Sequence, residues 1–382
     1  MIKIDKIIPG GEALGTDETG KKIFFWNALP GETIEEYEIT KKKSHYSRAI
    51  ATKINHSSEH RIEPKDDCFL STSPWQNMDY NYELSLKQDL VVELFRENQI
   101  EIPTPEIITD GNIYHYRNKM EYSLYYDHEK AQIFPAFHVR GSHRKIPVVK
   151  SSIERPEIFA KAIEIIDDLN SRGEEARKYQ SLLLRCNQTG EVSGGLYENG
   201  KPHPIFPNLT DTILGHAYSY SPNGFFQINL PVYELALTEI AKHITTNDVL
   251  DLYAGVGTIG LSTARDKNLT LVECDKSAFN ELKNNCHNKY NCLLDKSENV
   301  LKYINGHQTV ILDPPRAGCD RKLIDRLLEI KPSKIIYLSC NPATQARDVK
   351  LLSQVYNIEE VKTFNFFPRT PHIENLAVLE RN

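Results

Sequence analysis

The sequence predicts an α/β protein in three parts: a small β-barrel, a central α+β domain, and a parallel sheet covered by helices. Its 382 residues exceed one typical domain. Short strand-forming segments broken by glycine turns fill residues 1–55, which is typical of a small barrel. From residue 231 to residue 382 strands alternate with helices, and this order favours a parallel sheet. Residues 56–230 then form the central part.

The expected elements follow from local patterns. Strand formers occupy 22–26 and 33–40 in the first part, and residues 79–98 carry an apolar face at helical spacing. In the central part the pattern predicts strands over 119–126 and 132–139 and a helix over 156–172. The strands expected in the last part are 248–253, 269–274, 309–312, 334–338 and, as a candidate antiparallel strand, 375–379.

Composition limits the cellular setting. There is no apolar run of about 18 residues and no apolar core at the N-terminus, so we expect neither a membrane span nor a signal peptide, and a cytoplasmic protein. Seven cysteines without repeated spacing do not predict a disulfide framework. Net charge is −6, yet 41–53 holds five Lys or Arg and no acid, and 112–150 holds seven against three acids. Such runs are either a solvated face or a surface for an anionic polymer.

A glycine loop opens the last part. "DVLDLYAGVGTIGL" places Gly255, Gly257 and Gly260 directly after a strand, and Glu273 ends the next strand. Such a loop lets the backbone approach an adenosine-containing cofactor, while the acid binds ribose hydroxyls; a tight structural turn is the alternative. The spacing does not separate NAD from S-adenosylmethionine. Asp313, followed by two prolines at a strand end, favours a methyltransferase, because a hydride-transfer enzyme has no evident need for it.

A candidate nucleophile ends the strand at 334–338. Asn341 is a good N-cap and Pro342 a good first helical residue, so Cys340 is expected between a strand and a helix N-terminus. The helix dipole there favours a thiolate.

Five motifs stand in order: "FFQIN" (225–229), "DLYAGVGTIGL" (251–261), "ILDPPRAG" (311–318), "LSCNPAT" (338–344) and "FFPRTPHIEN" (366–375). Together they resemble the RNA uracil-C5-methyltransferases, which make 5-methyluridine, over nearly the whole chain. The resemblance implies a Rossmann-like domain using S-adenosylmethionine, and it suggests that the helix near 83–98 packs with that domain.

The chemistry of uracil supports the same residues. Uracil C5 is a poor nucleophile, and addition of a thiolate to C6 turns C5 into an enolate-like carbon that accepts a methyl group. A base must then remove the C5 proton. The resemblance gives these catalytic roles to Cys340 and Glu374, with His372 as an orienting or packing residue. It also implies a set of cofactor-binding residues, the last of them less secure because relatives often carry Asn there: Gln227, Tyr253, Gly255, Gly257, Glu273, Asp313 and Thr258. A further contact falls somewhere in 295–299.

Other segments suggest RNA contacts. "IIPGGEALGTDETGKKIFFWNALPGE" resembles a TRAM domain, a small RNA-binding barrel, in which Lys41, Lys42 and Lys43 would contact phosphates. Arg117 and Lys119 are candidate phosphate contacts, whereas Tyr114 and Tyr116 are expected in the core. Arg316 either contacts RNA phosphate or braces its loop.

Two departures from the family pattern matter. Many relatives hold an iron–sulfur cluster with four cysteines, but this stretch reads "DDCFLSTSPWQN", with Cys68 alone, so no cluster and no metal are expected. An Asp that often precedes the Phe-Pro motif is Asn365, which could alter a supporting hydrogen bond.

These observations predict methylation of uridine C5 in structured RNA by a monomer, with 23S ribosomal RNA favoured over the transfer RNA T-loop. An RNA cytosine-C5-methyltransferase is one alternative, although the second cysteine expected for it after the two prolines is Arg316 here, and Cys319 lies three residues further on. A non-catalytic RNA-binding or chaperone protein is the other.

Overall fold

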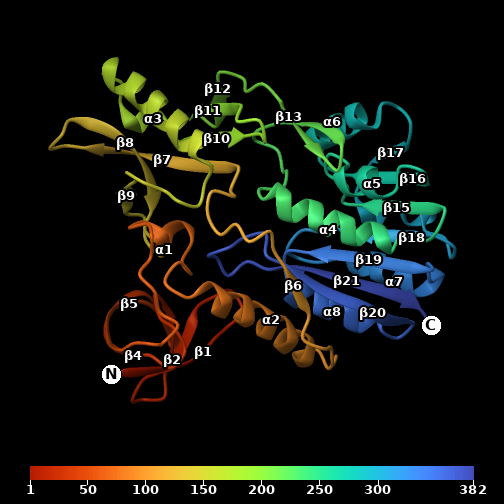
Figure 1. Cartoon of the computed structure of the whole chain (residues 1–382), viewed down its shortest axis with the longest axis horizontal. Helices are drawn as coiled ribbons and strands as arrows, with labels where there is room; N and C mark the ends of the chain where they lie inside the picture. Colours follow the sequence, from red (N-terminus) through yellow and green to blue (C-terminus); the bar gives the residue numbers. More distant parts are fainter.

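The computed structural model describes all 382 residues. Residues 2–56 form a closed five-stranded barrel, strand order β1-β2-β3-β5-β4, and its interior is filled by buried apolar side chains such as Phe25, Ile34 and Ala49 (Figure 1). The strands are β1 (Ile2–Ile7), β2 (Ala13–Thr16), β3 (Lys22–Trp26), β4 (Thr33–Lys42) and β5 (Tyr46–His56). Closure leaves this small sheet without unpaired edges.

The central part is a six-stranded sheet of order β12-β11-β10-β7-β8-β9, on which α3 (Pro156–Ser171) packs. Pro156 is the first residue of this helix, a position where its missing N–H is harmless. The strands are β7 (Lys119–Asp127), β8 (Gln132–His138), β9 (Lys145–Pro147), β10 (Ser181–Cys186), β11 (Val192–Glu198) and β12 (Lys201–His203), with a 3₁₀ turn at Ala176–Lys178.

The largest unit is an eight-stranded sheet of order β17-β16-β15-β18-β19-β21-β20-β6. The strands β15 to β19 run parallel, and β21 lies antiparallel between β19 and β20. The strands are β6 (Glu106–Ile108), β15 (Asp248–Leu252), β16 (Asn268–Glu273), β17 (Asn291–Leu294), β18 (Thr309–Leu312), β19 (Lys334–Ser339), β20 (Tyr356–Phe364) and β21 (Glu374–Arg381). The predicted fold class, an α/β protein with a barrel at its start, is confirmed.

Helices cover both faces of this sheet, so its strands are apolar on both sides. Alternate residues of β19 show this directly: Ile335 and Tyr337 belong to one core cluster, whereas Ile336 and Leu338 belong to the other. One face carries α4 (Leu230–Lys242), α5 (Thr258–Thr263) and α6 (Lys276–Cys286); the other carries α7 (Arg321–Ile330) and α8 (Pro342–Leu352). Two 3₁₀ turns, Ser297–Asn299 and Leu301–Tyr303, follow β17.

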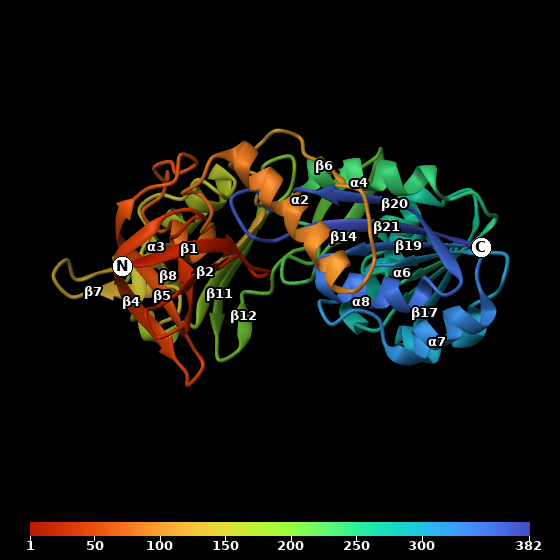
Figure 2. The ribbon, with the colours of Figure 1, turned by 90° about the horizontal axis from the view of Figure 1, so that it is seen from below.

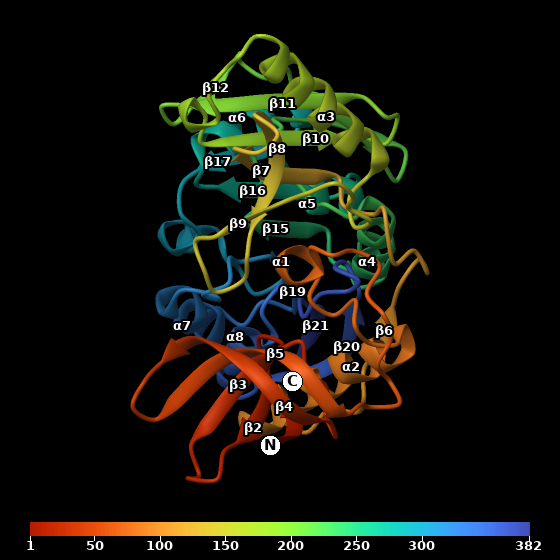
Figure 3. The same cartoon turned by 90° about the vertical axis from the view of Figure 1, so that its left-hand side faces the viewer.

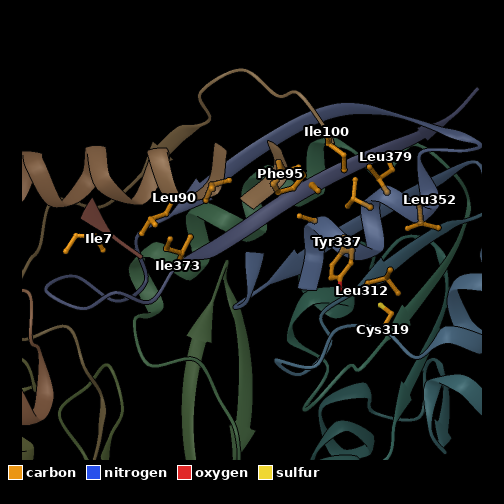
Figure 4. Packing of buried hydrophobic residues seen from close by; sticks show 14 of the residues in the cluster. Ile7, Leu90, Phe95, Ile100, Leu312, Cys319, Tyr337, Leu352, Ile373 and Leu379 are labelled. Carbon is orange, nitrogen blue, oxygen red and sulfur yellow. The ribbon is translucent and has the colours of Figure 1, made fainter. Parts of the chain in front are cut away.

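The helix α2 (Tyr80–Glu97) joins the barrel to the sheet. Asp79 is its N-cap, since its carboxylate accepts hydrogen bonds from the backbone N–H groups of Asn81 and Tyr82. Leu90 and Phe95 belong to a single core cluster that includes Ile7 of the barrel and reaches α8 and β21 (Figure 4). Seen from below, α2 runs from the barrel across to the edge of the large sheet (Figure 2).

The three parts are less consecutive than the predicted boundaries. The strand β6, far from residue 231, pairs with β20 at the sheet edge. The hairpin of β13 (Leu209–Ile213) and β14 (His216–Tyr220) contributes Tyr218 and Tyr220 to the core under α4 and α6. The physical reason is burial, because each segment covers apolar surface that its own neighbours in sequence cannot cover. In Figure 3 the central sheet lies at the top and the barrel at the bottom, both in front of the large sheet. A short helix, α1 (Phe69–Thr72), packs against β8 (Figure 1). No helix of the structure is long and apolar enough to cross a membrane.

Candidate active site

A cavity of about 1220 Å³ opens at the carboxyl ends of the parallel strands. Open α/β sheets bind ligands at this edge, where the strand order reverses. Here the order reverses between β15 and β18, and both strands end at the cavity. Residues of all five motifs line it, together with Arg117 and Glu273. A site for one small molecule occupies about 300–1,000 Å³. The cavity therefore has room for a cofactor and part of a second ligand.

The glycine loop forms one wall of the cavity. Gly255 has a left-handed backbone with φ +57°, and a side chain here would point into open space. Gly257 has φ +92°, and a Cβ atom on it would lie 2.5 Å from Leu282. Gly255 lines the cavity, whereas Gly257 and Gly260 do not, and we attribute a packing role to the last two.

Glu273 supports the loop as well as lining the cavity. One carboxylate oxygen accepts the backbone N–H of Gly255 at 2.8 Å, and the other accepts that of Asp275 at 2.6 Å. A carboxylate has further lone pairs, so it can still accept hydroxyl donors from a ribose. The residues present therefore fit a nucleoside cofactor in this wall.

The Cys340 turn is built as its sequence predicts. Asn341 is the N-cap of α8 and accepts the backbone N–H of Ala343 at 3.3 Å. Its side-chain amide also donates to the carbonyl of Arg316 at 2.8 Å, and the Thr344 hydroxyl donates to the same oxygen at 3.2 Å. These bonds fix the Asp-Pro-Pro loop to the turn that carries Cys340, so the two motifs form one wall.

The sheet register brings Cys340 and Glu374 together. Ser339 of β19 pairs with Asn375 of β21 in an antiparallel ladder. The next position along β19 is Cys340, and the next along β21 in the opposite direction is Glu374. Directly opposed residues have Cβ atoms roughly 5 Å apart. Two residues 34 positions apart in sequence are therefore neighbours in one cavity.

Burial and nearby charges set the protonation states of the acidic groups around Cys340. Burial, with smaller contributions from Glu374 and Asp313, raises the pKa of Cys340 to about 11, so the helix N-terminus does not outweigh desolvation. Burial also raises the pKa of Asp313 to about 7, and it raises the pKa of Glu374 well above its usual value. Arg316 acts in the opposite direction on Cys340 and Glu374. The free protein holds a thiol, and a positive charge brought into the cavity favours the thiolate.

Six of the seven expected cofactor residues line this cavity, and Gly257 lies just behind it. Tyr253 directly follows β15 and lies in the left-handed region, with φ +64°, which is uncommon for a residue with a side chain. Thr258 is buried at the start of α5. Within 295–299, where the sequence left the further cofactor contact open, Glu298 and Ser297 line the cavity. The Asp295 carboxylate instead accepts hydrogen bonds from the Lys296 backbone N–H and the Asn299 side-chain amide. Glu298 is thus the better candidate for an acidic contact.

The segment carrying Gln227 is held by a residue that the sequence did not single out. Arg185 of β10 is completely buried and donates to the carbonyls of Gly224, Phe226 and Gln227. Its guanidinium also lies over the Tyr220 ring, 5.0 Å from the centroid. An isolated arginine in a strand has no sequence signal for this role, because its acceptors are backbone carbonyls.

The expected RNA contacts lie in three places. Residues 41–43 are exposed at the end of β4 and the turn after it. Arg117 and Arg316 line the cavity, and an Arg316 nitrogen lies 3.5 Å from Nδ1 of the exposed His372. The Lys119 ammonium donates to the carbonyls of Asn223 and Gly224, both at 3.1 Å, and burial lowers its pKa to about 8. Lys119 is thus already engaged in holding the Gln227 segment.

The positions that depart from the family pattern are hydrogen-bonded. The Ser73 hydroxyl accepts the Gln76 amide at 2.6 Å, and buried Cys68 contacts the Lys150 carbonyl. Burial raises the pKa of the Cys68 thiol to about 12. Asn365 uses both ends of its amide: it accepts from Lys87 at 2.7 Å and donates to the Tyr80 hydroxyl at 3.1 Å. Tyr116 is buried, as predicted, whereas Tyr114 is only partly buried, with the Lys65 ammonium 4.4 Å from its ring centroid.

Comparisons with known proteins find similarity to RNA methyltransferases. Residues 296–382 match the family model for tRNA (uracil-5-)-methyltransferase. An uncharacterized RNA methyltransferase of Enterococcus faecalis is 29% identical over 447 aligned residues, covering 100% of this chain and 97% of its own. One from Mycoplasma mobile is 28% identical over 382, covering 97% and 95%.

The fold also has a solved counterpart. Pyrococcus abyssi tRNA (uracil-54, C5)-methyltransferase, in complex with S-adenosyl-L-homocysteine, superimposes with a TM-score of 0.74 at 24% identity, covering 99% of this chain and 100% of that one. At this identity the likeness establishes a shared fold. The chain is thus similar to RNA methyltransferases over its whole length and to the tRNA (uracil-5-)-methyltransferase family over residues 296–382.

Proposed function

We propose that this protein transfers a methyl group from S-adenosylmethionine to C5 of a uridine in structured RNA, through a covalent adduct of Cys340 with C6. The observation that carries the proposal is the pairing of β19 with β21, which sets Cys340 beside Glu374 in the cavity that also holds the glycine loop and Asp313. A nucleophile, a base and a cofactor wall are then within reach of one nucleotide.

The reaction assigns one task to each residue. The Cys340 thiolate adds to C6, and the π electrons of the C5–C6 bond move onto the C4 carbonyl as an enolate. S-adenosylmethionine supplies the methyl group that C5 takes up. The Glu374 carboxylate then removes the proton from C5, the C5–C6 double bond forms again, and the sulfur leaves C6 as thiolate. The balance is one proton released for each methyl group transferred.

The surrounding residues support these steps. Glu374 is only 2% exposed, so a base here is shielded from water until a nucleotide enters. Arg316 lowers the pKa of both Cys340 and Glu374, against the effect of burial. We propose Gln227, Tyr253, Gly255, Thr258, Glu273 and Asp313 as the cofactor contacts, with Gly257 shaping the loop.

We propose RNA as the polymer, reached through the exposed lysines 41–43 of the barrel and through Arg117 and Arg316 at the cavity. The barrel favours 23S ribosomal RNA, whereas the Pyrococcus abyssi protein of the same fold acts on transfer RNA. The target nucleotide must leave its stack to reach a cavity of this kind.

The test uses purified protein, methyl-tritiated S-adenosylmethionine, and unmodified transcripts of 23S ribosomal RNA and of a transfer RNA. Labelled 5-methyluridine in either product supports the proposal and names the substrate class. Label in 5-methylcytidine would establish the cytosine alternative. Cofactor binding without label in either RNA would support a non-catalytic scaffold. Cys340→Ala is the control variant, and methyl transfer that survives it contradicts the adduct.

A further inference from the structure

The segment 365–373, which leads into Glu374, belongs to neither strand of its hairpin. β20 ends at Phe364 and β21 begins at Glu374. Within the segment Arg369 has a left-handed backbone, with φ +65°, which a non-glycine residue adopts only when its surroundings hold it there. The segment therefore depends on contacts from outside the hairpin.

Those contacts come from distant parts of the chain. The Asn229 amide donates to the carbonyl of Phe366 at 3.1 Å, and the Tyr116 hydroxyl donates to that of Pro368 at 2.9 Å. The backbone N–H of Trp75 donates to the carbonyl of Arg369 at 3.0 Å. Each of these is a neutral hydrogen bond. Arg316 lies 3.5 Å from His372 at the far end of the segment, and the charged contacts to residues 365–369 come from α2.

Lys87 and Glu83 of α2 are both completely buried. The Lys87 ammonium donates to Glu83 at 2.9 Å, to the Asn365 side chain at 2.7 Å and to the Phe367 carbonyl at 3.1 Å. An ammonium has three N–H donors, and here three acceptors take them all, whereas a neutral amine would leave one acceptor unfilled. Burial lowers the pKa of Lys87, and Glu83 opposes this effect.

Glu83 completes the clamp from the other side. Its two carboxylate oxygens lie 2.9 and 3.1 Å from the backbone nitrogen of Arg369 and accept its N–H. The Arg369 side chain then donates to the carbonyl of Met78, the residue before the N-cap of α2, at 2.7 Å. Two residues one helical turn apart on α2 thus hold both ends of the stretch 365–369. Figure 4 shows α2 lying alongside the strand that follows this stretch.

We propose that Lys87 and Glu83 are positioning residues for Glu374, acting through the segment 365–373, and this inference rests on the proposed function of Glu374 as the base. Glu374 faces Cys340 only if β21 begins at the right place, and the contacts made by the two α2 side chains fix the segment that precedes it. Phe367, whose carbonyl Lys87 binds, lines the same cavity. The hydrogen bonds and ion pairs of the two side chains go to each other, Asn365, Phe367 and Arg369, and none goes to the cofactor wall built on β15, β16 and β18.

The test variant is Lys87→Met, which keeps the length of the side chain and removes the three donors. Glu83 would then keep Arg369 as its one charged partner, 3.8 Å away. Glu83→Gln/Lys87→Met is the second variant, because it removes both charges of the Lys87–Glu83 pair together. Glu93→Gln is the matched control, because Glu93 lies on the same helix and bonds only the exposed Lys6. We expect kcat to fall about 10- to 100-fold in the two test variants, with KM for S-adenosylmethionine unchanged.

A step-specific signature separates positioning from general damage. When proton removal slows, the methylated adduct persists, so a protein–RNA band resistant to denaturation should accumulate in Lys87→Met with the transcript that the wild-type protein methylates. With 5-fluorouridine in that transcript no base can release the adduct, so variant and wild type should trap equal amounts. Two results would overturn the inference. One is an adduct yield of Lys87→Met that falls equally on the ordinary transcript and on the 5-fluorouridine transcript. The other is a kcat of Lys87→Met equal to that of Glu93→Gln.

A readout that does not need activity completes the design. Hydrogen exchange of peptides spanning 365–373 should be faster in both test variants and unchanged in Glu93→Gln. Unchanged exchange in the test variants overturns the inference, whether or not the protein methylates RNA. If the wild-type protein makes no 5-methyluridine, the proposed function fails and with it the role of the pair toward a base. Faster exchange would then show only that the pair holds the segment.

Discussion

Binding of S-adenosylmethionine is expected to depend on pH more steeply than binding of S-adenosylhomocysteine. Among the acidic groups that line the cavity, Cys340, Glu374 and Asp313 have pKa values raised by burial, to about 7 for Asp313. Arg316 is the cation that acts on Cys340 and Glu374. The methylated cofactor brings a sulfonium charge into this cavity, whereas the demethylated product is a neutral thioether with the same nucleoside and amino-acid groups.

The sign follows from linkage. A nearby cation stabilises the carboxylate, so the bound sulfonium lowers the pKa of Asp313 and releases the proton held by the free protein. Below the pKa of about 7, affinity for S-adenosylmethionine therefore falls as pH falls. Well below that pKa one linked proton changes affinity about tenfold per pH unit. Because Asp313 is half ionised at its pKa of about 7, the loss from pH 7 to pH 5 is about 50-fold. The product lacks the charge and should lose far less.

Isothermal titration calorimetry measures this directly. Affinities of both molecules are compared at pH 5, 6, 7 and 8, and titrations in two buffers with different ionisation enthalpies count the protons released. Asp313→Asn is the control, because it keeps the shape of the side chain and cannot ionise. Parallel pH profiles for the two molecules, or a profile for S-adenosylmethionine that Asp313→Asn leaves unchanged, would refute the reasoning.

Three further predictions test other parts of the structure. Gly260→Ala would place a Cβ atom 2.7 Å from the buried carboxylate of Asp251, so we expect a loss of about 1–3 kcal/mol in the free energy of unfolding. Chemical denaturation measures this loss, with Gly306→Ala as the control, because the nearest atom to a Cβ there is 3.5 Å away. Replacing the lysines of 41–43 with glutamine should weaken RNA binding. The slope of log affinity against log salt concentration should become less steep by the equivalent of up to about three phosphate contacts, measured by filter binding between low and physiological salt. An unchanged slope contradicts a phosphate role. Because the pKa of Cys340 is raised to about 11, its alkylation by iodoacetamide in the free protein should rise about tenfold per unit between pH 7 and pH 10, and a plateau already at pH 8 would show that the thiol is more acidic than burial allows.

Much of the site could be predicted from local sequence. The N-cap and the proline after Cys340 specify a strand–turn–helix wherever the chain places them, and the structure has this turn with the expected cap. The strand at Thr309–Leu312 and the strand at Lys22–Trp26 coincide with the prediction, because each is a run of strand formers bounded by turn residues. Patterns of this kind depend on residues close in sequence.

Other elements could not be predicted in this way. β6 has three residues and no distinctive pattern, and it is a strand only because β20 offers it an edge. The ionic state of Cys340 could not be predicted from the sequence, because the helix N-terminus is visible there while the burial that raises the pKa of the thiol is not. Lys119 reads as a free cation in a basic stretch, yet its ammonium is taken by two carbonyls about 105 residues away.

The sequence by itself determined the chemistry that this protein can offer: a thiol before a helix, a carboxylate after a proline-rich turn, and a glycine loop with an acid beyond it. Only the tertiary structure decided how these groups act on one another. Register between β19 and β21 makes Cys340 and Glu374 neighbours, and buried side chains of α2 hold the segment before Glu374. The reason is physical, because pKa values and distances depend on burial and on contacts between residues far apart in the chain, and these exist only once it has folded.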